Sequence, residues 1–295
     1  MILGPRPATI EPIPGWRNPM HGPIPPQRYF PYLTWTEIVA MENRHQGVII
    51  QPLGAIEQHG PHLPLAVDSV LCTTVVGRAL AALDPAIPAY SLPPLYYGKS
   101  NEHSQFPGTI SLSAETLLRL LQEVGESIYR AGFRKFVLVN GHGGQPQVLE
   151  ILARDLHQRY PDLMVFPLFL WRAPNCAGEL LTPQELEFGI HAGDAETSLM
   201  LAVLPEQVRQ HLARAEFPPP LPAESCLSME GKLPFAWVTG DLSASGVLGD
   251  PTVATAAKGD RLLNSLVEGW VRVLTDIYHF CQPQALTATT LMKQP

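Results

Sequence analysis

The chain lacks the clusters of positive charge and the long apolar runs that would tie it to nucleic acid or to a membrane. Its Lys and Arg residues are scattered singly and the formal net charge is -7, whereas a phosphate backbone selects a cationic stripe. No apolar run approaches the roughly 20 residues that cross a bilayer, and the longest, Leu163 to Trp171, is interrupted by Pro167. We therefore expect neither nucleic acid nor a membrane as a partner.

Paired cysteines and a targeting segment are also missing. Cys72, Cys176, Cys226 and Cys281 lie far apart with no Cys-x-x-Cys pair, so neither redox chemistry nor a thiolate zinc site is indicated. Cys72 falls in an apolar helical stretch and is expected to be buried. Because the first residues match neither a signal peptide nor a transit peptide, the cytoplasm is the expected location.

Proline is concentrated at the start of the chain, where residues 1 to 31 hold nine of them. Proline fixes φ and has no N–H to donate, so this segment can form neither a helix nor a central strand. We interpret residues 1–30 as a Pro-rich arm that is either extended over the body or a neighbouring subunit, or disordered. Residues 31–295 are expected to form a single domain, because 45% apolar residues can build one large core.

After the arm, short apolar runs alternate with longer helical patterns, which predicts an α/β fold with a mostly parallel sheet flanked by helices on both faces. Strands are expected at residues 47–55, 87–92, 109–112, 136–140 and 163–170. Helices are expected after Asp68, at 114–131, after Pro146, at 194–204 and, as one helix or two, from Pro251 to about Phe280. Polar residues follow several strands, at the edge where open parallel sheets bind ligands.

Metal-capable side chains are densest in the segment EQHGPHLPLAVD, residues 57–68, directly after the first strand. Glu57 and His59 are two residues apart, so an extended segment points both to the same side, and a turn through Gly60 can bring Asp68 back toward them. Carboxylate plus imidazole is a ligand set that suits zinc or manganese, although such residues near a turn are also common on a solvated surface. His62 has an odd spacing from His59 and is expected to have a hydrogen-bonded structural role.

Two further motifs place polar residues beside strand ends. In NGHGG, residues 140–144, the glycines leave His142 exposed at the sheet edge, and a phosphate-binding loop is disfavoured because the Lys-Ser/Thr of such loops is missing. In HAGDAETS, residues 191–198, His191 precedes a helix whose first turn carries Asp194 and Glu196. The helix macrodipole alone can also account for acidic residues there.

The chain resembles the creatininase (creatinine amidohydrolase) family, because four motifs within residues 45–200 occur in the order found in that family: EQHGPHLPLAVD, EHSQFPGT (102–109), NGHGG and HAGDAETS. The segment GVLGDP (246–251) also resembles the family's C-terminal segment. The resemblance implies that Glu57, His59, Asp68 and His142 bind two divalent metals, with Asp68 bridging. Zinc is the first choice, and manganese or iron are alternatives. Creatininase proper has a glutamate ligand where this chain has Gly144. Glu196 is expected to replace it, and creatinine itself is disfavoured as the substrate.

The implied activity is a metal-dependent amidohydrolase that cleaves a non-peptide C–N bond in a small cyclic amide or formamide by metal-activated water. His191 is expected to be the acid/base, and His103 and Trp171 to line the substrate site, although a tryptophan after a strand is often core. Alternatives are a formamidopyrimidine-type deformylase, a peptide-cofactor maturation protease and, from another class, a non-catalytic metal-binding protein. The resemblance also implies a homo-oligomer, often a hexamer, acting on a small molecule.

Overall fold

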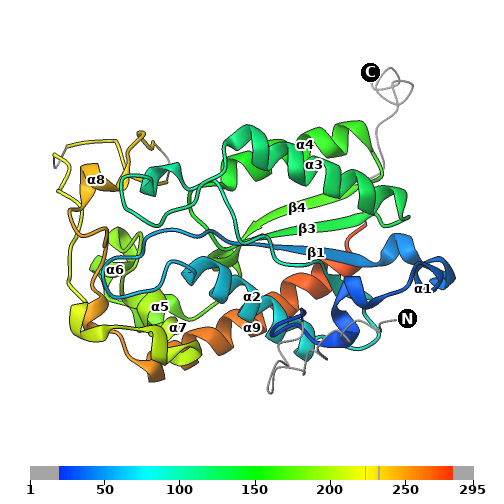
Figure 1. Ribbon diagram of the computed structural model, residues 1–295, viewed down its shortest axis with the longest axis horizontal. Helices are drawn as coiled ribbons and strands as arrows, with labels where there is room; N and C mark the ends of the chain where they lie inside the picture. The colour runs from blue at the N-terminus through cyan, green and yellow to red at the C-terminus, as the bar shows by residue number, and fades with distance from the viewer. Residues whose placement is uncertain (1–19, 223, 232, 282–295) are drawn as a thin grey trace, which may run out of the picture.

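A parallel sheet forms the centre of the computed structural model, which describes residues 20–222, 224–231 and 233–281 (Figure 1). Its four strands are β1 (Val48–Leu53), β2 (Ala89–Ser91), β3 (Lys135–Asn140) and β4 (Met164–Phe169), in the order β2-β1-β3-β4. Every pairing is parallel. The predicted α/β class is confirmed, and four of the five expected strands are present.

Helices cover both faces of the sheet, because successive residues of each strand point to opposite sides. Val48 and Ile50 of β1 belong to the core on one side, whereas Ile49 belongs to the core on the other. The first face packs against α2 (Val67–Ala82), α7 (Asp194–Val203) and α9 (Ala256–His279), and the second against α3 (Ala114–Arg130) and α4 (Pro146–Arg159). The remaining short helices are α1 (Trp35–Ala40), α5 (Ala177–Leu180), α6 (Pro183–Phe188) and α8 (Thr239–Leu242).

The C-terminal helix is one long element that starts later than the sequence indicated. Asp250 and Pro251 open only a short 3-10 turn, Pro251–Val253. α9 begins at Ala256, where the Thr255 side chain accepts a hydrogen bond from the Lys258 N–H. None of the helices within the described ranges is long and apolar enough to cross a membrane.

The predicted strand at residues 109–112 is wrong. This stretch forms a single antiparallel bridge between Ile110 and Ile56 and joins no strand of the sheet. Its backbone is committed to the loop after β1: Ile110 donates to the Ile56 carbonyl at 2.9 Å, and Thr109 Oγ1 accepts from the Gln58 N–H at 3.1 Å. The segment therefore stabilises the loop that carries Glu57 instead of adding a strand to the sheet.

The described part of the proline-rich arm, residues 20–30, lies on the body of its own chain. Ile24 and Tyr29 are buried in the core around α2. The Arg28 guanidinium donates to the Asp84 carbonyl at 3.0 Å, beyond the end of α2. Residues 1–19, the rest of the arm, lie outside the described residues. Cys72 is buried, as expected.

Candidate metal centre

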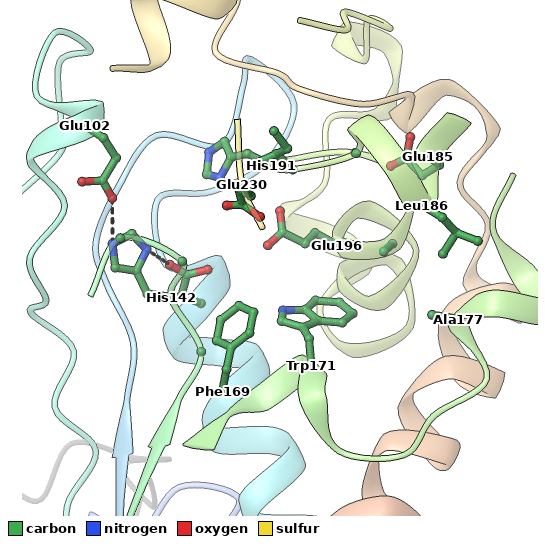
Figure 2. A pocket seen from close by; sticks show the side chains of 18 of the residues that line it. Glu102, His142, Phe169, Trp171, Ala177, Glu185, Leu186, His191, Glu196 and Glu230 are labelled. Atoms are coloured by element: carbon green, nitrogen blue, oxygen red, sulfur yellow. Dashed lines mark ion pairs between the residues drawn. The ribbon is translucent and has the colours of Figure 1, made fainter. Parts of the chain in front are cut away.

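The candidate site is built where the four strands end, which is the usual ligand position in an open parallel sheet (Figure 2). The loop after β1 carries Glu57 and His59, and the first turn of α2 adds Asp68. His142 follows β3 directly, and Glu196 comes from the first turn of α7. The structure thus brings together all five residues expected to be ligands.

Asp68 lies between two groups of ligand atoms. Its Oδ1 is 3.4 Å from His59 Nε2, and its Oδ2 is 3.2 Å from His142 Nδ1. On the His142 side, Glu57 Oε2 is 3.1 Å from Nδ1; on the His59 side, Glu196 Oε2 is 3.9 Å from Nε2. Ligand atoms on a tetrahedral zinc, with bonds of about 2.0–2.1 Å, lie roughly 3.3 Å from one another. Two triads that share Asp68 therefore have spacings suited to divalent ions.

Unsatisfied buried atoms give an independent indication of a metal. His59 Nε2 and Asp68 Oδ2 are buried and make no hydrogen bond, and their nearest polar neighbours are other proposed ligand atoms at 3.4 and 3.2 Å. A buried polar atom without a hydrogen bond is costly. His59 Nδ1 is engaged by the Glu57 carbonyl at 3.1 Å, which directs the Nε2 lone pair into the site. The donor set of carboxylates and imidazoles fits zinc or manganese.

The pKa values of the proposed ligands are shifted because several carboxylates lie close together in a buried space. Burial alone would lower the pKa of His59, but Asp68, Glu196 and Glu57 outweigh it and raise the pKa to about 9. Burial raises the pKa of Glu196, and Asp68 and Glu57 add to it, giving about 7. The pKa of His142 is held well above its usual value because Glu57, Asp68 and Glu102 outweigh burial. The cluster attracts positive charge, either protons or a cation.

The turn after β3 orients His142, and the Glu102 carboxylate occupies the space beside Gly144. Asn140 accepts the His142 N–H at 3.0 Å and donates to its carbonyl at 2.8 Å, while His142 Nε2 donates to the Lys99 carbonyl at 2.9 Å. A Cβ on Gly144 would lie 1.7 Å from Glu102 Oε1 and 2.5 Å from His142 Nε2. Glu196 adds a carboxylate on the His59 side, whereas position 144 lies beside His142, so the replacement of the missing ligand by Glu196 stays a prediction.

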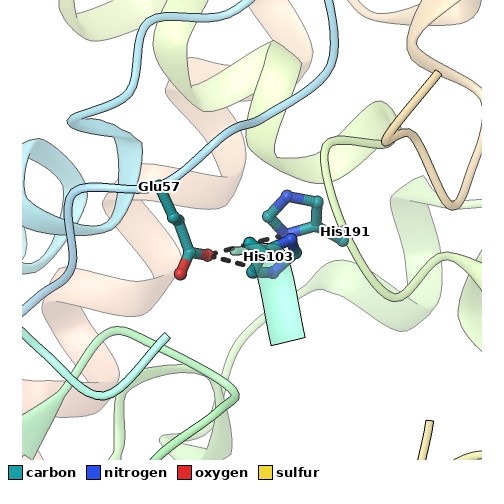
Figure 3. A group of neighbouring side chains, drawn as sticks. All are labelled: Glu57, His103 and His191. Atoms are coloured by element: carbon teal, nitrogen blue, oxygen red, sulfur yellow. Dashed lines mark ion pairs between the residues drawn. The ribbon is translucent and has the colours of Figure 1, made fainter. Parts of the chain in front are cut away.

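Two further histidines stand at the edge of the centre (Figure 3). His191 Nδ1 is 3.8 Å and His103 Nε2 is 3.5 Å from Glu57 Oε1, and the centroids of the two rings are 4.2 Å apart. Burial lowers the pKa of both, most strongly that of His191, where the nearby His59 and His103 add to the effect. Both rings are therefore neutral near neutral pH, a state in which each can accept or donate through one nitrogen.

A cavity of about 300 Å³ opens over the centre and is lined by Glu196, His103, Phe169 and Trp171, among others (Figure 2). An outer cavity of about 900 Å³ adjoins it. The two cavities are neighbours, because six residues line both: Glu102, Gly143, Gly144, Phe169, Glu230 and Trp237. Trp171 is half-buried and contributes to both the cavity wall and the core, and its contact with substrate stays a prediction.

His62 contributes to packing beside the site. It is fully buried, and its Nε2 contacts Thr197 Oγ1 at 2.8 Å. This contact agrees with the structural role expected from its odd spacing.

Several residues of the site were not singled out by the sequence. Ser100 donates to Glu57 Oε2, and Gln58 contacts both His103 and, through its carbonyl, His191. The sequence did offer a signal for each of them, because Ser100 lies next to the EHSQFPGT motif and Gln58 lies between two proposed ligands. Glu185, which accepts N–H groups from Asp194 and Asp250, and the cavity residues Glu230 and Trp237 had no local signal.

Comparison with known proteins decides the family. Residues 31–274 match a family model described as creatinine amidohydrolase (creatininase). The chain belongs to the creatininase family. The match includes residues 205–240, which carry none of the family-like motifs. Since the family's relatives are named as hydrolases or peptidases, this creatininase-family chain is a hydrolytic enzyme and the non-catalytic alternative is set aside.

Relatives of this creatininase-family chain differ in their named activities. A mycofactocin precursor peptide peptidase of Mycobacterium ulcerans is 39% identical over 229 residues, covering 76% of this chain and 82% of the relative. A creatinine amidohydrolase of Pseudomonas putida is 31% identical over 252 residues, covering 80% and 92%. A 3-dehydro-scyllo-inosose hydrolase of Thermotoga maritima is 28% identical over 246 residues, covering 78% and 77%.

Solved creatininase structures share the fold. A creatinine amidohydrolase (creatininase) structure has a TM-score of 0.67 at 28% identity and covers 86% of this chain and 99% of that chain. A mutant creatininase of the Zn–Zn type has a TM-score of 0.67 at 28% identity, covering 85% and 98%. A creatininase described as the Mn form has a TM-score of 0.66 at 27% identity, with the same coverage.

Proposed function

We propose that this creatininase-family hydrolase is a metal-dependent peptidase that cleaves an amide bond in a peptide-derived precursor. Support comes chiefly from the cavities: beside the space over the metal centre lies a second cavity of about 900 Å³, and the two together offer more room than a small ring fills. Support also comes from the mycofactocin precursor peptide peptidases, which are 34–39% identical to this chain, against 31% for the creatinine amidohydrolase. A peptide-maturation activity thus becomes the leading hypothesis.

In the proposed centre, Asp68 would be shared by two divalent ions. Glu57 and His142 would complete one site, and His59 and Glu196 the other. When bound, such a pair lowers the pKa of a water molecule and polarises a carbonyl. Zinc or manganese suits these ligands, and both metals are named in the titles of related creatininase structures.

The chain's own residues transfer the protons, orient the reacting groups and exclude water. His191 presents Nδ1 to the centre, 3.8 Å from Glu57 Oε1, where it can take a proton from the attacking water and return it to the leaving nitrogen. Ser100 donates a hydrogen bond to Glu57 Oε2 and so helps to orient that carboxylate. Phe169 and Trp171 form an apolar wall that keeps bulk water away from the amide.

A second candidate is hydrolysis of a small cyclic amide or formamide. The inner cavity alone, at about 300 Å³ and lined by Phe169, Trp171 and Trp237, is at the lower end of ligand pocket sizes and can enclose a single ring. Gly144 speaks against creatinine, because the glutamate ligand that creatininase proper carries at this position is missing here.

A substrate screen separates the two candidates. Protein stripped with a chelator is reloaded with zinc or manganese and incubated with pooled short peptides, and separately with creatinine, cyclic ureides, lactams and formamides. Mass spectrometry follows the products, and the His191→Ala variant serves as the catalytic control. Metal-dependent peptide cleavage supports the proposal. Turnover confined to the cyclic amides or formamides contradicts it.

A further inference from the structure

The side-chain amide of Gln58 has only one possible orientation, because main-chain groups hold it at both ends. Its Oε1 accepts the Gly60 N–H at 2.9 Å, and only an oxygen can accept there. Its Nε2 faces the Gly246 carbonyl at 3.1 Å, and only a nitrogen can donate there. Gln58 is 5% exposed, so water does not compete for these contacts.

This orientation determines where His103 carries its proton. Gln58 Nε2 lies 2.8 Å from His103 Nδ1, and since an amide nitrogen only donates, Nδ1 must accept. The Thr239 hydroxyl, 2.8 Å from the same Nδ1, can donate as well. The proton of the neutral ring is therefore on Nε2, the nitrogen that faces Glu57 and the metal centre at 3.5 Å.

The main chain of the same residue determines the proton of His191. His191 Nε2 lies 2.7 Å from the Gln58 carbonyl, which only accepts, so Nε2 must carry the hydrogen. Nδ1 is then the nitrogen with the free lone pair, and it faces Glu57 at 3.8 Å. The two rings, with centroids 4.2 Å apart, thus share one tautomer but turn opposite ends to the centre (Figure 3).

We propose that Gln58 is a positioning residue that makes His103 a hydrogen-bond donor to the reacting carbonyl oxygen and leaves His191 as the base. The roles rest on the proposed amide hydrolysis, whereas the tautomers do not. Negative charge develops on the carbonyl oxygen as water attacks, and a fixed N–H in a dry site stabilises it. His103 donates without losing its proton, and His191 takes up the water proton and gives it to the leaving nitrogen.

Nitrogen NMR of zinc-loaded protein with ¹⁵N-labelled histidine tests the tautomers without any substrate. Signals of the two rings are assigned by their disappearance in His103→Gln and His191→Gln. We expect both rings as Nε2–H forms in the wild type. In Gln58→Glu, which keeps the main-chain carbonyl but offers only acceptors to His103, we expect a proton on His103 Nδ1 and an unchanged His191. Thr239→Val is the control, because Gln58 still donates and His103 should stay an Nε2–H form.

A wild-type His103 that carries its proton on Nδ1 alone, or a Gln58→Glu variant in which His103 is unchanged, overturns the inference. These results leave the peptidase proposal untouched, since they do not depend on turnover. Conversely, a screen without peptide cleavage contradicts the proposed function while the tautomers stand.

Kinetics on a peptide found in the screen then tests the donor role. His103→Leu removes the N–H, and we expect kcat to fall about 100- to 1,000-fold with KM little changed, as for loss of one oxyanion donor. His103→Gln keeps an N–H donor in nearly the same place, although its amide cannot act as an acid or a base. We therefore expect this variant to retain at least about a tenth of kcat. Equal loss in the two variants, with bound metal unchanged, contradicts a donor role.

Discussion

Asp68 is the residue on which both proposed metal sites depend, and Asp68→Asn is the perturbation that tests this. Asparagine keeps the size of the side chain but removes the negative charge and replaces one of the two ligand oxygens with an amide nitrogen. In the wild type one oxygen lies 3.4 Å from His59 Nε2 and the other 3.2 Å from His142 Nδ1. A single change therefore weakens both triads.

The size of the effect has a lower bound. Losing a residue that only orients a metal ligand costs about 10- to 100-fold in metal affinity, so loss of a shared direct ligand should cost at least ~100-fold at each site. This corresponds to about 2.8 kcal/mol per site. Glu196→Gln is the matched control, because the Glu196 carboxylate pairs with His59 and not with His142, so the change should affect one site alone.

The assay is metal content per chain after dialysis against a fixed concentration of free zinc, with circular dichroism to confirm folding. We expect two ions in the wild type, about one in Glu196→Gln and none in Asp68→Asn. Two ions retained in folded Asp68→Asn would show that Asp68 is not shared. Loss of both ions in Glu196→Gln would show that the two sites are not separable as described.

His191→Ala should keep its metals and lose turnover by roughly 100- to 10,000-fold, the range expected for loss of a positioned acid or base. Metal content is measured on the sample used for kinetics, and loss of metal from it would show that His191 is a ligand instead. Because the pKa of metal-free His59 is about 9, zinc must displace its proton at lower pH. Calorimetric zinc affinity should then rise about tenfold per pH unit per displaced proton up to about pH 9, and a flat profile from pH 6 to 8 contradicts this. Gly54→Ala places a Cβ 2.5 Å from Ser69 Oγ and 2.6 Å from its Cα, so it should lower the free energy of unfolding in urea by about 1–3 kcal/mol. Gly178→Ala, with no atom within 4 Å of the new Cβ, is its control, and equal losses would refute the packing argument.

Much of the fold could be predicted because the local and tertiary signals agree. β1 and β3 are buried along their whole length, and each has an apolar run, Val48–Ile50 and Phe136–Val139, that predicts a buried strand. Ser113 caps α3 through the Thr116 N–H, as its position before the helical pattern predicts. The prediction failed at residues 109–112, where a short apolar run pairs with a loop instead of the sheet, a choice set by tertiary contacts.

That the five proposed ligands lie together could be predicted because they fall in compact motifs, but the residues that support them could not be predicted. Glu185 holds the N–H groups of Asp194 and Asp250, residues 56 positions apart in the sequence, and no local pattern encodes such a contact. The role of Gly144 became clear only from the carboxylate of Glu102, which occupies the space its side chain would need. Contacts between distant segments decide these details.

The most direct test of the account is the rate of peptide cleavage measured against the number of metal ions bound per chain, on one preparation titrated from the metal-free state. The account predicts no cleavage without metal, and full cleavage only when both triads around Asp68 are filled, with Asp68→Asn inactive at every metal concentration. Cleavage by metal-free protein, or a wild-type rate in folded Asp68→Asn, would contradict it.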